Sequence, residues 1–377
     1  MIMKGVSLYS GAGGFDVGFT KAGFKILFAN DFDKSACETY RQNFGDHVRH
    51  GDINKLTDEL FETCKGVDVD VVFGGPPCQG FSVAGKMNPD DPRSQHIWTF
   101  AKVIENVRPK AFVMENVKAL AVLTKFEALR TELLARFRRA GYSVNFVVLN
   151  ATDFDVPQSR DRVFFIGFKT DTVGVPDLNQ MLEPYKKKAQ TVRKALSVLD
   201  RVGTGNNTSI CNAKITLSGR PVLRKSPYAG MLFNGMGRPV KIDGYSNTLP
   251  ASMGGNKTPI IDNDELYEKK SSWVEDYHSK IWDGSPTASL PLELPEVPSR
   301  LRRLTIEEAA VLQTFPLTHK FYGPQTSKFK QIGNAVPCNL GYGIARMVMN
   351  YLKKGGLVEV EERVPRQLEL ALEMEIA

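Results

Sequence analysis

One cysteine stands in a setting that suits a nucleophile. Cys78 lies in the run PPCQGFS at residues 76–82, directly after the apolar, strand-like residues 69–73 and a glycine pair. Two prolines stiffen this loop, and its small residues let a ligand approach the backbone closely. A thiolate at the end of a strand can attack an electrophilic carbon. The alternative is a buried structural thiol, and the setting favours the nucleophile.

Glycine and acidic residues follow the other strand-like segments of the first half. The run SGAGGF at residues 10–15 opens a helix, so its glycines can bring the backbone close to a ligand. Asp31 follows the next strand, where an acid accepts hydrogen bonds from ribose hydroxyls. Asp52 follows a third strand and can accept from an exocyclic amine. The combination favours a nucleoside cofactor, with Glu115 as a carboxyl acid near the cysteine.

The elements that must position these residues alternate between strand and helix. Strands are expected at residues 6–9, 26–29, 69–73, 111–114, 144–149 and 163–167, and helices at about 16–22, 97–107 and 126–140. This alternation predicts an α/β fold with a mostly parallel sheet and helices on both faces. Ligands bind at the carboxyl ends of such strands, where all five chemical features fall. Phe15 and Phe32 either sandwich an adenine ring there or pack in the core.

Composition indicates an enzyme of a reducing compartment. The five cysteines form no CxxC pair, which argues against a disulfide framework or a zinc site. No apolar run is long enough to span a bilayer, and the N-terminus lacks a signal-peptide layout, so a cytoplasmic protein is expected. The 49 Lys and Arg exceed the 42 Asp and Glu, a balance that favours a polyanionic partner.

Residues 186–300 differ in character from the rest of the chain. They carry 17 Lys and Arg against 11 Asp and Glu, and turn-rich pieces such as residues 233–239 replace the strand–helix rhythm. This predicts an irregular basic domain between two parts of an α/β domain, 1–185 and 301–358. Solvated loops of one large domain are the alternative. Residues 359–377 form an acidic, Leu-rich tail to which no role is assigned.

Taken together, these motifs resemble those of the DNA (cytosine-5)-methyltransferases, especially the single-chain bacterial modification enzymes. In the family's order they are SGAGGF (10–15), Asp31, Asp52, PPC (76–78), ENV (115–117), QSRDR (158–162), RLT (303–305), EAA (308–310) and QIGNAVP (331–337). The cysteine motif and the closing motif are specific, whereas many Rossmann-like proteins share the glycine turn. The family more often has Glu and Trp at the positions of Asp31 and Phe32.

The resemblance implies a Rossmann-like domain that binds S-adenosyl-L-methionine and releases S-adenosyl-L-homocysteine, without a metal. The expected cofactor residues are Ser10, Gly11, Ala12, Gly13, Gly14, Phe15, Asp31, Phe32, Asp52, Ile53, Pro76, Asn334 and Ala335. Asn334 is expected at the start of an apolar helix that contains Cys338. A capping box at Thr305 predicts another helix that extends to Thr314.

The resemblance also implies covalent chemistry on a cytosine. The Cys78 thiolate attacks carbon 6, which makes carbon 5 electron-rich enough to accept a methyl group. Glu115 contacts ring nitrogen 3 and the amino group, Arg162 holds the carbonyl oxygen, and Arg160 supports the site. On the residues alone, Arg160 and Arg162 read as an exposed salt-bridging pair. The target base must first be flipped out of the duplex.

The basic domain matches the family's target-recognition domain, in which Lys and Arg contact phosphates and a few side chains read bases. The expected DNA contacts are Ser82 and Arg93, on a loop that closes over the base, Thr248 in a Thr-Leu signature, and Arg220, Arg224, Lys225, Arg238 and Lys257. Double-stranded DNA is the expected partner of a monomeric enzyme. A genetic partnership with a cognate restriction endonuclease would fit the family.

Two alternative functions remain open. A transfer-RNA cytosine-5 methyltransferase has the same cysteine and Glu-Asn-Val motifs, but usually a smaller target domain, so the long basic insertion favours DNA. A non-catalytic DNA-binding homologue would keep the fold, but every expected catalytic residue is present. The main interpretation is a sequence-specific DNA (cytosine-5)-methyltransferase.

Overall fold

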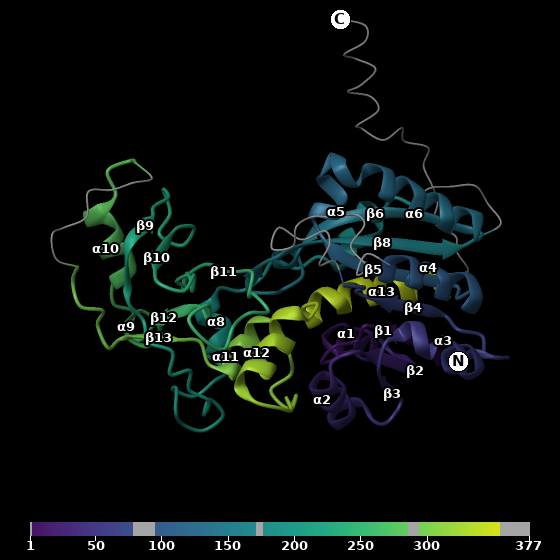
Figure 1. Cartoon of the computed structure of the whole chain (residues 1–377), viewed down its shortest axis with the longest axis horizontal. Helices are drawn as coiled ribbons and strands as arrows, with labels where there is room; N and C mark the ends of the chain where they lie inside the picture. The colour runs from purple at the N-terminus through teal and green to yellow at the C-terminus, as the bar shows by residue number, and fades with distance from the viewer. Residues whose placement is uncertain (1, 78–94, 171–175, 286–293, 355–377) are drawn as a thin grey trace, which may run out of the picture.

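The structure is a computed structural model that describes residues 2–77, 95–170, 176–285 and 294–354. Several predicted features therefore lie outside the described residues: Cys78, Ser82, Arg93 and the tail 359–377. Figure 1 shows two lobes that an open gap separates, joined through the segment that carries α11, α12 and α13. The larger lobe holds a sheet between helices, and the smaller one consists of short strands and helices.

A seven-stranded sheet forms the larger lobe, in the order β3-β2-β1-β4-β5-β8-β6. The strands are β1 (Met3–Leu8), β2 (Phe24–Asp31), β3 (Val48–His50), β4 (Val71–Gly74), β5 (Ala111–Val117), β6 (Tyr142–Asn150) and β8 (Asp161–Lys169). Neighbours among β1 to β5 pair in parallel, while β8 runs antiparallel between β5 and β6. The predicted α/β fold with a mostly parallel sheet is confirmed.

Alternating side chains divide the strands between two cores, as the two-residue period of a strand requires. Val113 in β5 packs in one core, which includes residues of α1 and α13, whereas Phe112 and Met114 pack in the other, with residues of α3, α4 and α6. These helices are α1 (Gly14–Ala22), α2 (Lys34–Phe44), α3 (Ile53–Cys64), α4 (Gln95–Val107), α5 (Ala119–Val122), α6 (Glu127–Arg139) and α13 (Cys338–Lys353). Because both faces are covered, the strands are predominantly apolar, and polar residues that suit a binding site follow their carboxyl ends.

The smaller lobe is built from short elements. They are β9 (Leu217–Val222), β10 (Met231–Phe233), β12 (Ile260–Asp262), β13 (Leu301–Arg303), α8 (Val192–Leu196), α9 (Asn263–Glu268), α10 (Trp273–Ile281), α11 (Ile306–Leu312) and α12 (Gln325–Asn334). Antiparallel pairing of β12 with β13 carries this lobe past residue 300, and residues of α8, α11 and α12 share one apolar core. The segment 301–334 therefore packs with the segment that precedes it, while its residues 319–331 also bond to Ala12, Asp33, Thr39 and Asn43 of the larger lobe.

Two short strands join the lobes: β7 (Gln158–Ser159) pairs in parallel with β11 (Ser246–Asn247). The remaining short elements are α7 (Leu178–Leu182) and the single turns η2 (Thr124–Phe126), η3 (Ala151–Asp153) and η4 (Glu183–Tyr185). The seam between the lobes is thus tied by backbone pairing as well as by side chains.

One predicted helix start is wrong. Asn334 is the last residue of α12, and the apolar helix α13 begins only at Cys338, with Pro337 as its N-cap. A proline here ends the preceding backbone hydrogen-bond ladder and suits the start of the next helix. The predicted capping box is confirmed, because the Thr305 side chain accepts from the Glu308 N–H, but its helix ends at Leu312.

Candidate active site

An ion pair stands at the carboxyl end of β5. The Nε of Arg162 lies 2.9 Å from the Glu115 carboxylate, and the two side chains are only 17% and 13% exposed. Antiparallel pairing puts the start of β8 beside the end of β5, with Arg162 opposite Val117. A second Arg162 nitrogen donates to the Asp161 carbonyl at 2.7 Å, which fixes the guanidinium. The pair therefore presents a carboxylate and a planar cation together.

The chain leads from β4 past this pair toward Cys78. The Glu115 carboxylate lies against Gly75, where a Cβ would stand 2.8 Å from its Oε2. The neighbouring Asn116 side chain is buried and donates to the Pro76 carbonyl at 3.2 Å. The last described residues before Cys78 are thus held against the strand end that carries Glu115.

The predicted glycine turn closes the end of β1. Gly13 N–H donates to the Ser10 carbonyl at 2.9 Å, and Ser10 is itself fixed through the Asn30 carbonyl at the end of β2. Gly11 has φ +55°, and a Cβ there would meet no atom within 4 Å. The turn therefore leaves open space directly above its backbone, at the start of α1. Ala12 is 1% exposed and packs inward.

Asp31 supports this turn from the neighbouring strand. Its carboxylate accepts from the Gly11 N–H and the Asp33 N–H, both at 2.8 Å. Burial raises the pKa of Asp31, although these two N–H groups oppose the shift. Each carboxylate oxygen keeps a second lone pair for a ligand hydroxyl. The side chain thus shapes the turn and remains a candidate for ribose.

The two aromatic candidates have different surroundings. Phe32 is 76% exposed directly after β2, which leaves its ring available to a ligand. Phe15 is 4% exposed, and its ring packs edge-on against Phe19 and Phe73. Of the two roles considered for Phe15, core packing is the one that the structure displays.

Asp52 and Ile53 begin α3 beside the turn. The Asp52 carboxylate caps the helix by accepting from the Asn54 N–H at 3.0 Å, and it remains partly exposed. Ile53 is 1% exposed, so its side chain belongs to the core and only its backbone can face a ligand. Pro76 is buried as well.

Two residues near the turn escaped the sequence analysis. Tyr9 has φ +55°, and its hydroxyl donates to the His96 carbonyl at 3.2 Å, which links β1 to the start of α4. Burial raises the pKa of Tyr9, and the charge on Asp52 adds to the shift. His319 donates from Nε2 to the Ala12 carbonyl at 3.0 Å, and burial lowers its pKa to about 4, so it is neutral. The only sequence signal that could have indicated either residue was an aromatic side chain, Tyr9, one position before the glycine turn.

Arg160 faces away from the Glu115–Arg162 pair. Its side chain is 2% exposed, and one nitrogen donates to the carbonyls of Gly333 at 3.1 Å and Leu249 at 3.5 Å. The expected exposure is therefore wrong for both arginines, since Arg162 is also largely buried, although Arg162 does form an ion pair, with Glu115. Arg160 ties the two lobes together at the seam.

Asn334 and Ala335 lie where α12 ends. Asn334 is exposed and Ala335 partly buried. A Cβ at Gly14 would stand 2.9 Å from the Cβ of Ala335, so this segment packs directly on the glycine turn. The tertiary structure therefore brings residues more than 300 positions apart to one place.

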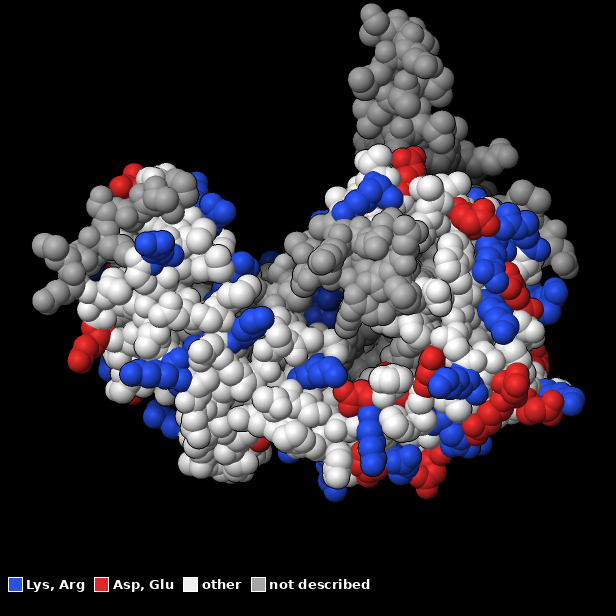
Figure 2. Space-filling view, viewed as in Figure 1, with Lys and Arg blue, Asp and Glu red and all other residues white. Residues whose placement is uncertain are grey.

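The predicted DNA contacts in the smaller lobe lie on its surface. They are Arg220, Arg224, Lys225, Arg238, Thr248 and Lys257, all of them exposed. The Thr248 hydroxyl donates to the Ser159 carbonyl at 2.9 Å, which places it at the seam between the lobes. Figure 2 shows lysine and arginine side chains around the hollow between the lobes, while on the outer edge of the larger lobe basic and acidic side chains are interspersed.

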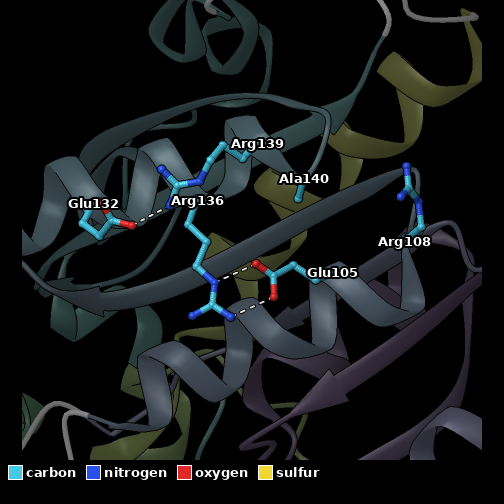
Figure 3. Close-up of a pocket in the computed structure, with 6 residues that line it drawn as sticks. All are labelled: Glu105, Arg108, Glu132, Arg136, Arg139 and Ala140. Atoms are coloured by element: carbon cyan, nitrogen blue, oxygen red, sulfur yellow. Dashed lines mark hydrogen bonds and ion pairs between the residues drawn. The ribbon is translucent and has the colours of Figure 1, made fainter.

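A separate surface pocket lies between α4 and α6 (Figure 3). Arg136 makes two hydrogen bonds to Glu105, at 2.6 and 2.8 Å, and Arg139 pairs with Glu132 at 2.6 Å. The Arg136–Glu105 contact joins α6 to α4, so we interpret the pocket as structural. None of the predicted site residues lines it.

The described residues contain neither a metal-binding group nor a membrane-spanning helix. No group of three or more His, Cys, Asp or Glu side chains there is arranged to hold a metal ion. No described helix is both long and apolar enough to cross a membrane.

Comparison with known proteins agrees with this geometry. The family profile of C-5 cytosine-specific DNA methylases matches residues 3–350. The type II methyltransferase M1.HphI of Haemophilus parahaemolyticus is 36% identical over 357 residues, which cover 93% of this chain and 87% of that protein. M.MthTI of Methanothermobacter thermautotrophicus is 32% identical over 370 residues, 94% of this chain and 99% of that protein.

Solved structures show the same fold. The methyltransferase EhMeth of Entamoeba histolytica superposes with a TM-score of 0.64 at 15% identity, over 93% of this chain and 99% of that one. A DNA modification methyltransferase encoded within an E. coli prophage gives 0.62 at 21% identity, over 93% and 99%. With the profile match over nearly the whole chain, the conclusion is that this chain belongs to the C-5 cytosine-specific DNA methylase family.

Proposed function

We propose that the protein transfers a methyl group from S-adenosyl-L-methionine to carbon 5 of a flipped-out cytosine in a specific duplex DNA sequence. The observation that carries this proposal is the Glu115–Arg162 pair at 2.9 Å, held at the strand end beside the segment that leads to Cys78. The type II names of the relatives support a role as the protective half of a restriction–modification system.

The residues around the glycine turn fit the cofactor. Gly11 leaves open space, the Asp31 carboxylate keeps lone pairs for ribose hydroxyls, and the exposed Phe32 ring offers a face to adenine. When bound, the cofactor supplies an electrophilic methyl group on a sulfonium. The protein's part is to orient that group toward the cytosine and to keep water away from it.

Cytosine needs activation before its carbon 5 can accept a methyl group. The Cys78 thiolate adds to carbon 6 and forms a carbon–sulfur bond, and the electron pair moves toward carbon 5, ring nitrogen 3 and the carbonyl oxygen. Glu115 forms hydrogen bonds with ring nitrogen 3 and the amino group and so stabilises the charge that develops in the ring, and Arg162 binds the carbonyl oxygen. After methylation, a base removes the carbon 5 proton, and elimination of the thiolate restores the aromatic ring. Cys78 leaves this cycle unchanged.

The ion pair suits this division of roles. Since Arg162 holds Glu115 in place before substrate arrives, the two groups need little reorganisation when a cytosine edge reaches them. Their low exposure strengthens each electrostatic interaction with the base. A base in a duplex cannot reach this buried pair, so the base must be flipped out.

Bisulfite sequencing of a plasmid from cells that express the protein tests the proposal. We expect methylated cytosines in one short recurring context, no methylation with Cys78→Ala, and full methylation with the matched control Cys211→Ala. A duplex with 5-fluorocytosine at the methylated position should trap the wild type as a denaturation-resistant adduct, because fluorine blocks loss of the carbon 5 substituent. Unmethylated DNA from soluble wild-type protein would refute the proposal; methylated transfer RNA would then favour the RNA alternative.

A further inference from the structure

Three fully or nearly buried polar side chains cross the seam between the lobes, and the chemistry proposed above uses none of them directly. They are Gln158 and Gln313, both 0% exposed, and Arg160, 2% exposed. Buried polar groups are retained where their hydrogen bonds specify one arrangement of the backbone. The backbone segments that these three side chains bond to therefore indicate their role.

Toward the smaller lobe, the network holds the segment that begins at Thr248. The Leu249 N–H donates to Gln158 Oε1 at 3.0 Å, and the Leu249 carbonyl accepts from Arg160 at 3.5 Å. Thr248 is fixed through Ser159, the next residue of β7. Residues 248–251 thus receive their position from β7 and the start of β8. This strip, Thr248–Ala251, carries the exposed threonine expected to contact DNA.

Toward the larger lobe, the same network holds the last residues of α12 and the residues directly after it. Gln158 Nε2 donates to Gln313 Oε1 at 3.1 Å. Gln313 Nε2 in turn donates to the Ile332 carbonyl at 2.7 Å and to the Ala335 carbonyl at 3.4 Å. The Gly333 carbonyl accepts from Arg160 at 3.1 Å. Residues 332–336 form what we name the strut.

The strut touches both binding surfaces. A Cβ at Gly333 would stand 2.6 Å from the Pro250 carbonyl, so the strut packs backbone against backbone on the strip. On its other side, a Cβ at Gly14 would stand 2.6 Å from the Val336 carbonyl, so the strut packs equally closely on the glycine turn. Contacts this close leave neither neighbour free to move alone.

From this geometry we infer that Gln313 is a positioning residue that keeps the DNA-facing strip and the cofactor turn in register through the strut, so that binding at one surface favours binding at the other. The inference rests on the proposed function for the identity of the two ligands. Gln313 touches neither ligand surface. It acts by fixing the strut with both ends of its amide, one toward Gln158 and one toward the strut carbonyls.

Linkage gives this inference a quantity to measure. If cofactor raises DNA affinity by some factor, DNA raises cofactor affinity by the same factor, and such factors are typically about 5 to 150. Substitution of a residue that only stabilises the fold lowers both affinities or the folded fraction without changing this factor. Substitution of a residue that keeps the two surfaces in register changes the factor itself.

The test measures the dissociation constant of S-adenosyl-L-homocysteine by calorimetry, with and without a duplex that the wild type methylates. The variant is Gln313→Met, which keeps the length of the side chain and removes its hydrogen bonds. We expect the wild type to show a factor of about five or more and Gln313→Met a factor near one. The matched control is Gln331→Met. Gln331 is also buried, but it bonds to Thr39 and Tyr322 on the opposite side of α12.

Each outcome bears on the inference. An unchanged factor in folded Gln313→Met, or a wild type with no coupling, overturns it, and neither result affects the proposed methylation, which bisulfite sequencing tests separately. If Gln313→Met does not fold, Gln158→Leu takes its place, because it cuts the same network one bond earlier. Loss of coupling in Gln331→Met as well would also overturn the inference, by indicating a general effect of instability.

Discussion

Asp16, in the first turn of α1, is a buried carboxyl directly after the cofactor turn. It is 0% exposed, and its Oδ1 accepts from the Tyr40 hydroxyl at 2.9 Å. Its Oδ2 is buried without a partner in hydrogen-bond geometry among the described residues. Burial raises the pKa of Asp16 from 3.8 to about 7, although the hydroxyls of Tyr40 and Ser7 oppose the shift. Above pH 7 the folded protein therefore carries an unfavourable charge that Asp16→Asn removes.

The direction in which stability changes with pH follows from proton binding in the folded and unfolded states. Because the pKa is higher in the folded state, the folded protein keeps a proton that the unfolded chain loses between pH 3.8 and 7, so stability falls as pH rises through this window. The full penalty, present above pH 7, is about 4 kcal/mol at 1.36 kcal/mol per pKa unit. Asparagine does not titrate, but its amide leaves a buried donor that costs about 1–3 kcal/mol at every pH.

The pH dependence of the mutational effect is therefore the decisive quantity. We expect the free energy of unfolding of Asp16→Asn, relative to wild type, to be higher at pH 8 than at pH 4.5 by roughly 3 kcal/mol. Urea unfolding followed by tryptophan fluorescence at both values measures it.

Asp33→Asn is a control whose pKa shift has the opposite direction. Burial acts to raise the pKa of Asp33, but the ion pair with Lys330 and backbone N–H groups lower it overall. The stability that this carboxylate contributes is therefore present above pH 3.8 and is lost only as pH falls below that value, so Asp33→Asn should be destabilised almost equally at pH 4.5 and pH 8. A difference between Asp16→Asn and wild type that does not vary with pH would refute the reasoning.

Four further predictions concern the site. Phe32→Ala should leave unfolding stability within about 0.5 kcal/mol, because the ring is exposed, yet weaken S-adenosyl-L-homocysteine binding about tenfold in calorimetry. Gly11→Ala should weaken the same binding, since its Cβ fills the open space and φ +55° strains the turn, and undiminished affinity would contradict the assigned pocket. Glu115→Gln should lower kcat for methyl transfer to a duplex about 10²–10⁴-fold with unchanged cofactor affinity, whereas a full rate would remove Glu115 from the chemistry. His319→Phe should leave the Ala12 carbonyl unpaired and lower the free energy of unfolding by about 1–3 kcal/mol at pH 8. Because the folded pKa of His319, about 4, lies below the unfolded value of 6.5, the wild type should lose its advantage over the variant as pH falls from 6.5 toward 4. Urea unfolding at several pH values checks this.

The sequence predicted those features that depend on local patterns. Apolar strands bounded by glycine and acidic residues indicated the parallel sheet and the edge that carries Asp31, Asp52 and Glu115, because a strand buried on both faces keeps its polar chemistry for its ends. The capping box at Thr305 was readable for the same reason, since its hydrogen bonds join residues three apart.

Only the tertiary structure decided what depends on contacts between distant segments. The sequence could not show that Arg160 points into the seam while Arg162, two residues later, meets Glu115, because both directions suit an arginine in that motif. Nor could it join Gln158 to Gln313 and the strut, which lie more than 150 residues further along the chain and meet Gln158 only when the lobes pack. Local patterns determine elements and their ends, whereas the direction of a buried polar side chain depends on which backbone groups the fold leaves for it to satisfy.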